Sequence, residues 1–131
     1  MTTLLEQCVK DAVIFWRHIA IEAESSSVDK VDKTDVIRKY NLKLKTVTRN
    51  TFYSPYCFYD VHMKTNDCSN CPGILPNGTG FKPPARTPCL AVGSPCQGFV
   101  NDFGEDRKLA ILEMYELTKR VAEFYNVQVE V

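Results

Sequence analysis

Residues 53–96 read YSPYCFYDVHMKTNDCSNCPGILPNGTGFKPPARTPCLAVGSPC and hold five of the chain's six cysteines and all seven of its prolines. The five cysteines are Cys57, Cys68, Cys71, Cys89 and Cys96. A segment so rich in proline, glycine and asparagine, without sustained apolar periodicity, cannot bury enough apolar surface to hold itself together. Thiolates gathered on a metal ion would supply that cohesion. We therefore predict that residues 51–100 form a cysteine-rich loop stapled by a metal.

The spacing Cys68-Ser69-Asn70-Cys71 places two thiolates on one tight turn, where both can bind a single ion. One further cysteine lies upstream and others lie downstream, so two more ligands can come from separate arms of the loop. Four thiolates make a closed tetrahedral zinc site, which leaves no open position for water and no hydrolytic chemistry. The predicted zinc ligands are Cys57, Cys68, Cys71 and Cys89, with Cys96 or His62 able to replace one of them.

Other interpretations of the cysteines stay open. Iron–sulfur ligation uses the same residues, and Cys71-Pro72 resembles the Cys-Pro ending of ferredoxin runs, but the spacing is too scattered. A redox Cys-x-x-Cys follows a strand and opens a helix, whereas Pro72 and Gly73 continue the loop. The even cysteine count and the Asn77-Gly78-Thr79 sequon would suit a disulfide-linked secreted domain. Structural zinc is the interpretation that we prefer.

The overall charge is balanced, with 16 basic and 16 acidic residues, which argues against an unfocused polyanion binder. Residues 29–50 carry seven Lys or Arg against three Asp (net +4), whereas residues 101–131 carry four against seven acids (net −3). No apolar run approaches the roughly 18 residues of a membrane span. Glu6, Lys10 and Asp11 do not suit a leader peptide. We therefore expect a reducing cytoplasm and no membrane association.

Residues 3–24 are predicted to form a long first helix, because apolar residues recur at steps of three and four. The expected inward residues are Leu5, Cys8, Val9, Ala12, Phe15, Trp16 and Ile19. Cys8 lies on this face, so we expect it to be a small buried hydrophobe. His18 lies beside the face and is expected to be a partly exposed structural residue.

A second, short helix is expected to begin at an N-cap formed by Thr34 or Asp35 and to turn Val36, Ile37 and Tyr40 inward. The run LKLKTVT, residues 42–48, alternates apolar and polar residues and predicts a strand whose basic face continues to Arg49. That face is the one place where basic charge could concentrate, although a solvated strand surface is the simpler interpretation.

A final helix is predicted from about residue 105 to residue 125, capped by Asn101 or Asp102. Its expected inward residues are Ala110, Met114, Leu117, Val121 and Phe124, with Leu109, Leu112 and Tyr115 widening the stripe. Val127, Val129 and Val131 alternate with polar residues, which predicts a short strand able to pair with residues 42–48.

These elements predict a single α+β domain over residues 1–131. Its long N- and C-terminal helices would pack with a short two- or three-stranded sheet. The helical and strand scaffold would comprise residues 1–50 and 101–131, and the metal-stapled loop would comprise residues 51–100.

Several short motifs recur together in the cysteine-rich part of the chain. They are Ser54-Pro55-Tyr56-Cys57, Asp67-Cys68-Ser69-Asn70-Cys71-Pro72, Thr79-Gly80, Cys89 and Gly93-Ser94-Pro95. This pattern resembles a group of small cysteine-rich phage and prophage proteins. Those proteins carry Cys-Pro-x-Cys, Cys-x-x-Cys-Pro and Thr-Gly motifs and a late cysteine. They also have an N-terminal helix that contains a tryptophan, which corresponds to Trp16 here. The resemblance implies a cysteine zinc site and a viral origin, but no activity. Ser54 replaces the first cysteine and Cys96 an aromatic residue, which leaves the fourth ligand open.

Three functions follow as hypotheses. The first is a zinc-stabilised binding module, a phage or virion-associated accessory protein that contacts a host or virion protein, with aromatic residues near Cys57 as interface anchors. The second is nucleic-acid binding through residues 42–49 and the aromatic residues of segment 52–59. The third is a His-metal nuclease-like enzyme using Asp60-Val61-His62, although a matching downstream helix is missing. A non-enzymatic role is favoured, because phosphate loops and nucleophile elbows are absent from the sequence.

Overall fold

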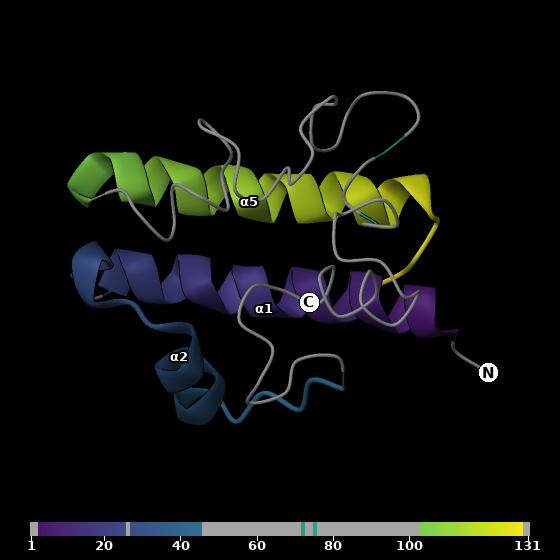
Figure 1. The fold of residues 1–131 in the computed structure, drawn as a ribbon, viewed down its shortest axis with the longest axis horizontal. Helices are drawn as coiled ribbons and strands as arrows, with labels where there is room; N and C mark the ends of the chain where they lie inside the picture. The colour runs from purple at the N-terminus through teal and green to yellow at the C-terminus, as the bar shows by residue number, and fades with distance from the viewer. Residues whose placement is uncertain (1–2, 26, 46–71, 73–74, 76–102, 130–131) are drawn as a thin grey trace, which may run out of the picture.

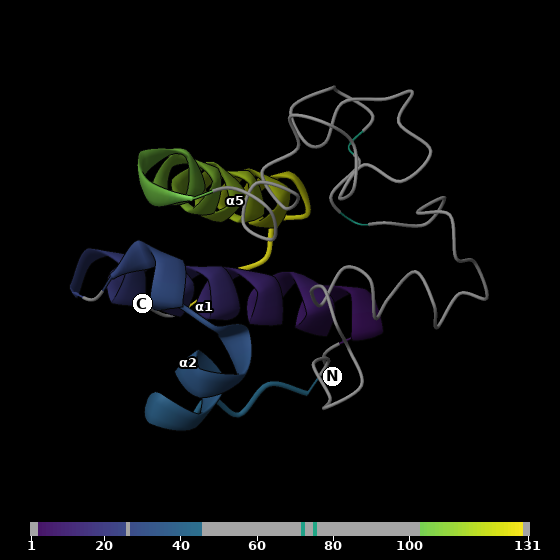
Figure 2. The same cartoon turned by 60° about the vertical axis from the view of Figure 1, so that its left-hand side comes forward.

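The computed structural model describes residues 3–25, 27–45, 72, 75 and 103–129. Their elements are α1 (Leu4–Ser25), the 3-10 helix η1 (Val28–Lys30), α2 (Lys33–Lys39) and α5 (Gly104–Phe124). Helices α1 and α5 lie side by side and run in opposite directions, while α2 lies on the other side of α1 (Figure 1, Figure 2). Helix α1 is therefore the central element and is covered from two sides.

Helix α1 buries a wide face because it has neighbours on two sides. Its buried residues are Cys8, Val9, Asp11, Ala12, Val13, Phe15, Trp16, Ile19, Ala20 and Ala23. The rings of Phe15 and Trp16 meet edge to face with their centroids 5.2 Å apart, which is a favourable aromatic geometry. The predicted helix is confirmed to within one residue at each end, and its predicted stripe is buried apart from Leu5, which packs partly exposed against the core.

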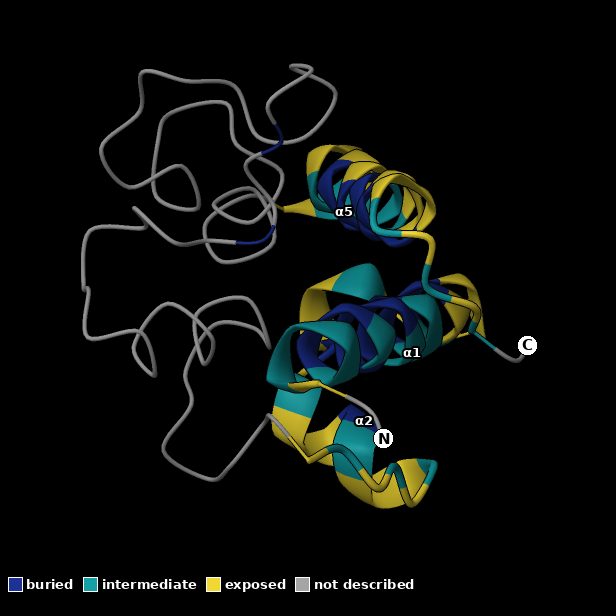
Figure 3. Cartoon of the chain, turned by 90° about the vertical axis from the view of Figure 1, so that its right-hand side faces the viewer, coloured by how far each residue is buried: buried dark blue, intermediate teal, exposed yellow. Residues whose placement is uncertain are grey.

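Helix α5 turns a narrower face toward α1, and the buried sides of the two helices face each other (Figure 3). Its buried residues are Ala110, Ile111, Met114, Leu117, Thr118, Val121 and Ala122. The predicted helix is right in extent, but its predicted stripe is wrong at Leu109 and Phe124, which are both exposed. The contact centres on Ile111, and two residues turn a helix by about 200°, so Leu109 lies on the opposite side.

The start of α5 is capped by a residue that is distant in sequence. Phe103 occupies the N-cap position without a side-chain cap, and the Asp29 carboxylate accepts the Gly104 N–H at 2.7 Å. Gly104 adopts a left-handed φ of 56°, which glycine tolerates best. The predicted caps Asn101 and Asp102 lie outside the described residues. An acidic side chain at a helix N-terminus also suits the helix dipole, so Asp29 supports α5 electrostatically.

Arg107 fastens the first turn of α5 to the segment around η1. Its guanidinium donates to the carbonyl oxygens of Val28 and, at 2.8 Å, of Val31. Burial lowers the pKa of Arg107, while the charges of Asp29 and Asp32 raise it. Arginine still stays protonated at neutral pH because its ordinary pKa is so high. The Val28 oxygen also accepts the Val31 N–H at 3.4 Å, so the guanidinium adds a second donor to that oxygen and supplies one to the Val31 carbonyl.

Helix α2 begins two or three residues earlier than predicted. Asp32 is its N-cap, and the Asp32 carboxylate accepts the backbone N–H of Asp35 at 3.2 Å. The predicted caps Thr34 and Asp35 are therefore wrong, because both residues already lie inside the helix. Val36 is buried as expected, and Ile37 and Tyr40 pack partly buried against the core.

Glu22 holds α2 against α1. Both of its carboxylate oxygens accept hydrogen bonds from Lys39 Nζ at 3.0 Å, and one also accepts from the Tyr40 hydroxyl at 2.8 Å. The Glu22 side chain is only 13% exposed, whereas Lys39 is largely exposed. Hydrogen bonding to Glu22 is the main cause that raises the pKa of Lys39 and of Tyr40 above their ordinary values.

This arrangement predicts a loss of stability at alkaline pH. A raised pKa in the folded state means that both groups stabilise the fold below their ordinary pKa of 10.5 and 10.0, and lose that contribution as the pH rises through the folded values. We expect the stability advantage of the wild type over Glu22→Gln to shrink between about pH 9 and about pH 12. Denaturant unfolding of both proteins across this pH range measures the difference in their free energies of unfolding. A difference that stays constant with pH would contradict the role assigned to Glu22.

Helices α2 and α5 end in the same way, at Tyr40-Asn41-Leu42 and at Tyr125-Asn126-Val127. Each asparagine adopts a left-handed φ, 50° at Asn41 and 54° at Asn126. The next N–H then reaches back five residues, from Leu42 to the Ile37 oxygen at 3.0 Å and from Val127 to the Ala122 oxygen at 2.8 Å. This Schellman geometry satisfies the last helical carbonyl groups and reverses the chain direction.

The predicted α+β fold is wrong for the part of the chain that can be described, which contains helices and no strand. Residues 42–45 and 127–129 alternate in burial, as the sequence indicates. Leu42, Leu44, Val127 and Val129 pack partly buried against the core, while Lys43, Lys45 and Gln128 are exposed. The alternation arises because one side of each extended segment packs against the helices, not because the segments pair as strands. Residues 46–48 and Val131 of the predicted strands lie outside the described residues.

Candidate functional site

The predicted metal ligands cannot be placed. Cys57, Cys68, Cys71, Cys89, Cys96 and His62 all lie outside the described residues, as do Arg49, Asp60 and the aromatic residues of segment 52–59. Within the ranges that the structure describes, no three His, Cys, Asp or Glu side chains gather in a way that could hold a metal ion. The zinc site therefore stays a prediction.

Two residues of the cysteine-rich segment are described, and both are buried. Pro72 directly follows Cys71, and Leu75 is only 2% exposed. Leu75 belongs to the same apolar core as residues of α1 and α5. Leu75, four residues after Cys71, is therefore anchored in the helical core, which bears on how a metal bound by Cys71 would act.

Residues 45 and 104, which bracket the undescribed part of this segment, are also tied to the scaffold. The Lys45 N–H donates to the Asp11 carboxylate at 2.9 Å, and the Gly104 N–H donates to Asp29. Asp11 is almost fully buried and also accepts from Gln7 Nε2 at 2.8 Å. A buried carboxylate needs such donors to offset its lost hydration. Sequence reasoning missed this role, and the only signal was an acidic residue beside the apolar stripe of α1.

Cys8 and His18 lie where the sequence predicts. Cys8 is fully buried in α1. His18 is partly buried; its Nδ1 lies 2.7 Å from the Ile14 carbonyl oxygen, and its ring centroid lies 5.0 Å from that of Tyr40. Because a carbonyl oxygen only accepts, Nδ1 carries the proton in this hydrogen bond.

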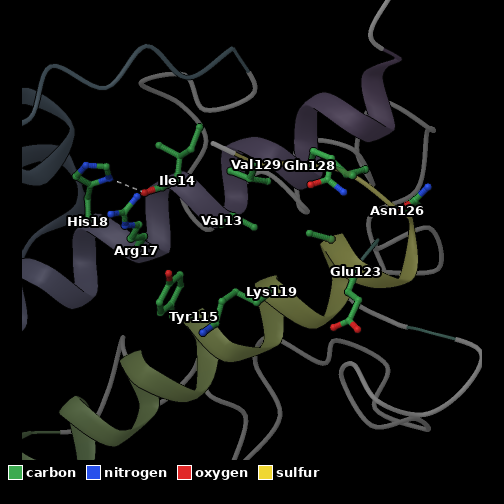
Figure 4. Close-up of a pocket in the computed structure, with 12 residues that line it drawn as sticks. Val13, Ile14, Arg17, His18, Tyr115, Lys119, Glu123, Asn126, Gln128 and Val129 are labelled. Carbon is green, nitrogen blue, oxygen red and sulfur yellow. Dashed lines mark hydrogen bonds between the residues drawn. The ribbon is translucent and has the colours of Figure 1, made fainter. Parts of the chain in front are cut away.

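A groove of about 640 Å³ opens between α1, α5 and the chain that follows α5 (Figure 4). Its lining residues are Val13, Ile14, Arg17, His18, Tyr115, Lys119, Ala122, Glu123, Asn126, Val127, Gln128 and Val129. Such a volume lies in the range of small-molecule sites. The sequence analysis did not predict the groove, which depends on how segments from the two halves of the chain meet.

One end of the groove is polar and basic. Figure 4 shows Arg17 and His18 on α1 opposite Tyr115 and Lys119 on α5. Lys119 Nζ pairs with Glu116 at 2.8 Å and lies 4.7 Å from the Tyr115 ring centroid. Hydrogen bonding to Glu116 is the main cause that raises the pKa of Lys119. Lys119 therefore stays protonated, and the Glu116 carboxylate offsets its positive charge.

Comparisons with known proteins identify no relative: no family model, no curated protein and no solved structure matches the chain. None of the helices in the described ranges has the length and apolar character to cross a membrane. The function must therefore be argued from the residues themselves.

Proposed function

We propose that the protein is a small zinc-stabilised binding module, a viral or phage accessory protein that acts through contacts with a host or virion protein. Zinc would be held by Cys57, Cys68, Cys71 and Cys89. A closed shell of four thiolates has no open coordination position, so its contribution is structural rather than catalytic. Because thiolates persist in a reducing environment, the proposal places the protein in the cytoplasm of a host cell.

The observation that carries the proposal is the burial of Pro72, which directly follows Cys71, and of Leu75, four residues after Cys71. A metal bound by Cys68 and Cys71 would lie within a few residues of the helical core, so ordering these cysteines would also order the chain that enters the core. This linkage supports a metal that stabilises the scaffold rather than one on an independent arm.

A protein partner is favoured by charge and by exposed apolar surface. The formal net charge is zero, which gives little long-range attraction for nucleic acid. Phe103 and Leu109 are large apolar side chains exposed near the start of α5. Exposed apolar side chains of this kind are available to anchor a partner.

Cobalt substitution tests the ligand set. Co²⁺ in a tetrahedral thiolate site absorbs strongly, so its visible spectrum reports ligand number and geometry. We expect Cys57→Ser, Cys68→Ser, Cys71→Ser and Cys89→Ser each to weaken or shift this spectrum. Cys8→Ala is the matched control, because its thiol lies in the helical core, and it should leave the spectrum unchanged. An unchanged cobalt spectrum in all four variants would refute the proposed ligand shell. A weakened cobalt spectrum in Cys96→Ser or His62→Gln would assign that residue as the fourth ligand.

A further inference from the structure

The groove between α1 and α5 divides into two chemically different parts. Its polar end carries Arg17, His18, Tyr115 and Lys119. Its remaining apolar lining comes from both helices and from the segment after α5. These apolar residues are Val13, Ile14, Ala122, Val127 and Val129. A site with one basic end and an apolar wall suits an amphipathic anion, because each part of such a ligand meets matching chemistry.

Arg17 is the group best placed to bind the anion. Among the described residues, Lys119 already pairs with Glu116, whereas no ion pair or hydrogen bond engages the Arg17 guanidinium. The side chain of Tyr115 points from α5 toward Arg17 (Figure 4), so its hydroxyl can add a second donor. A planar guanidinium binds a carboxylate through two parallel hydrogen bonds.

The charge balance favours a singly charged head group. Glu116 beside Lys119 and Glu123 in the lining both carry negative charge close to the groove. A dianionic phosphate would meet these carboxylates with one arginine, unpaired among the described residues, to offset them, whereas a carboxylate matches one guanidinium. The groove volume of about 640 Å³ also leaves room for an apolar chain beyond the head group.

We propose that this groove binds a monocarboxylate with an unbranched apolar chain, with the carboxylate on Arg17 and Tyr115 and the chain along Val13, Ala122 and Val129. None of the residues that line this groove belongs to the proposed zinc shell, because all of them come from α1, α5 and the segment after α5. Binding is therefore expected in protein with or without bound zinc, provided that the helices remain folded.

Isothermal titration of the full chain with decanoate, below its micelle concentration, tests the proposal. Decyltrimethylammonium has a comparable chain with the opposite charge, and acetate has the head group without the chain. We expect decanoate to bind at least about tenfold more tightly than either, since both the charged pair and the apolar wall contribute. Equal binding of the cationic surfactant, or no binding of decanoate, would overturn the proposal.

Two substitutions locate the ligand. Arg17→Gln should weaken decanoate binding about tenfold, because it removes a charge-assisted pair. Lys43→Gln is the matched control, because Lys43 is an exposed cation that does not line this groove, and it should bind as the wild type does. Val129→Asp, which places a carboxylate on the apolar wall near the end of the described chain, should likewise weaken decanoate binding, by at least about tenfold. Helical circular dichroism confirms folding of each variant, and equal affinity in Arg17→Gln and Lys43→Gln would refute the site.

Discussion

Replacing Cys68 and Cys71 together by serine is expected to abolish zinc binding and to remove about 4 kcal/mol of stability at free zinc about a thousandfold above the dissociation constant. The reason is linkage: a metal that binds only the folded state stabilises that state by mass action. This loss is large against the roughly 5–15 kcal/mol of a typical domain. Denaturant unfolding with added zinc, and again with chelator, measures it.

The double variant should unfold identically with and without zinc, whereas the wild type should lose stability on chelation. Cys8→Ala removes a thiol from the core of α1, so it should lower stability in both conditions while keeping the full response to zinc. If the Cys68/Cys71 double variant keeps the response to zinc, the assignment of these two ligands fails.

Ile111→Ala is expected to lower the free energy of unfolding by about 3 kcal/mol, because it leaves a cavity between α5 and α1. Ile111 is 0% exposed and lies in the central core cluster. Leu109→Ala is the matched control on the same helix, since Leu109 is 55% exposed, and it should change stability by less than about 0.5 kcal/mol. Urea unfolding followed by Trp16 fluorescence measures both, because Trp16 lies in the same core.

The pair also decides which way α5 faces. The sequence pattern placed Leu109 on the inward stripe, whereas the structure turns it outward. A larger loss for Leu109→Ala than for Ile111→Ala would place Leu109 in the core and contradict the packing of α5 described above.

The long helices could be predicted because their apolar residues recur at helical spacing over about six turns. The inward side of α5 was harder to predict. Its apolar residues surround much of the helix, so periodicity alone leaves the orientation uncertain by one position. The strands were wrongly predicted because Leu42-Lys43-Leu44-Lys45 and Val127-Gln128-Val129 alternate with period two, which indicates extended chain with one buried side. Periodicity does not say whether a strand or a helix pair covers that side.

Contacts between distant residues escaped sequence reasoning. Asp29 caps α5 from 75 residues away and Asp11 accepts from Lys45 across 34 residues. The residues around each aspartate form no local sequence pattern that would predict its hydrogen-bond partner. The groove could not be predicted for the same reason, because Arg17 and Tyr115 come to line one cavity only after α1 and α5 pack. The cysteine cluster was visible in the sequence because its members share a short segment and a metal-ligand spacing.

The zinc content per chain tests the central claim most directly. It is measured by elemental mass spectrometry on protein purified under reducing conditions, and reactive thiols are counted before and after chelation. The proposed site predicts about one zinc per chain and about four additional reactive thiols once the metal is removed. Three released thiols would bring His62 into the shell. Protein without metal, whose thiol count is the same before and after chelation, would contradict a zinc-stabilised module.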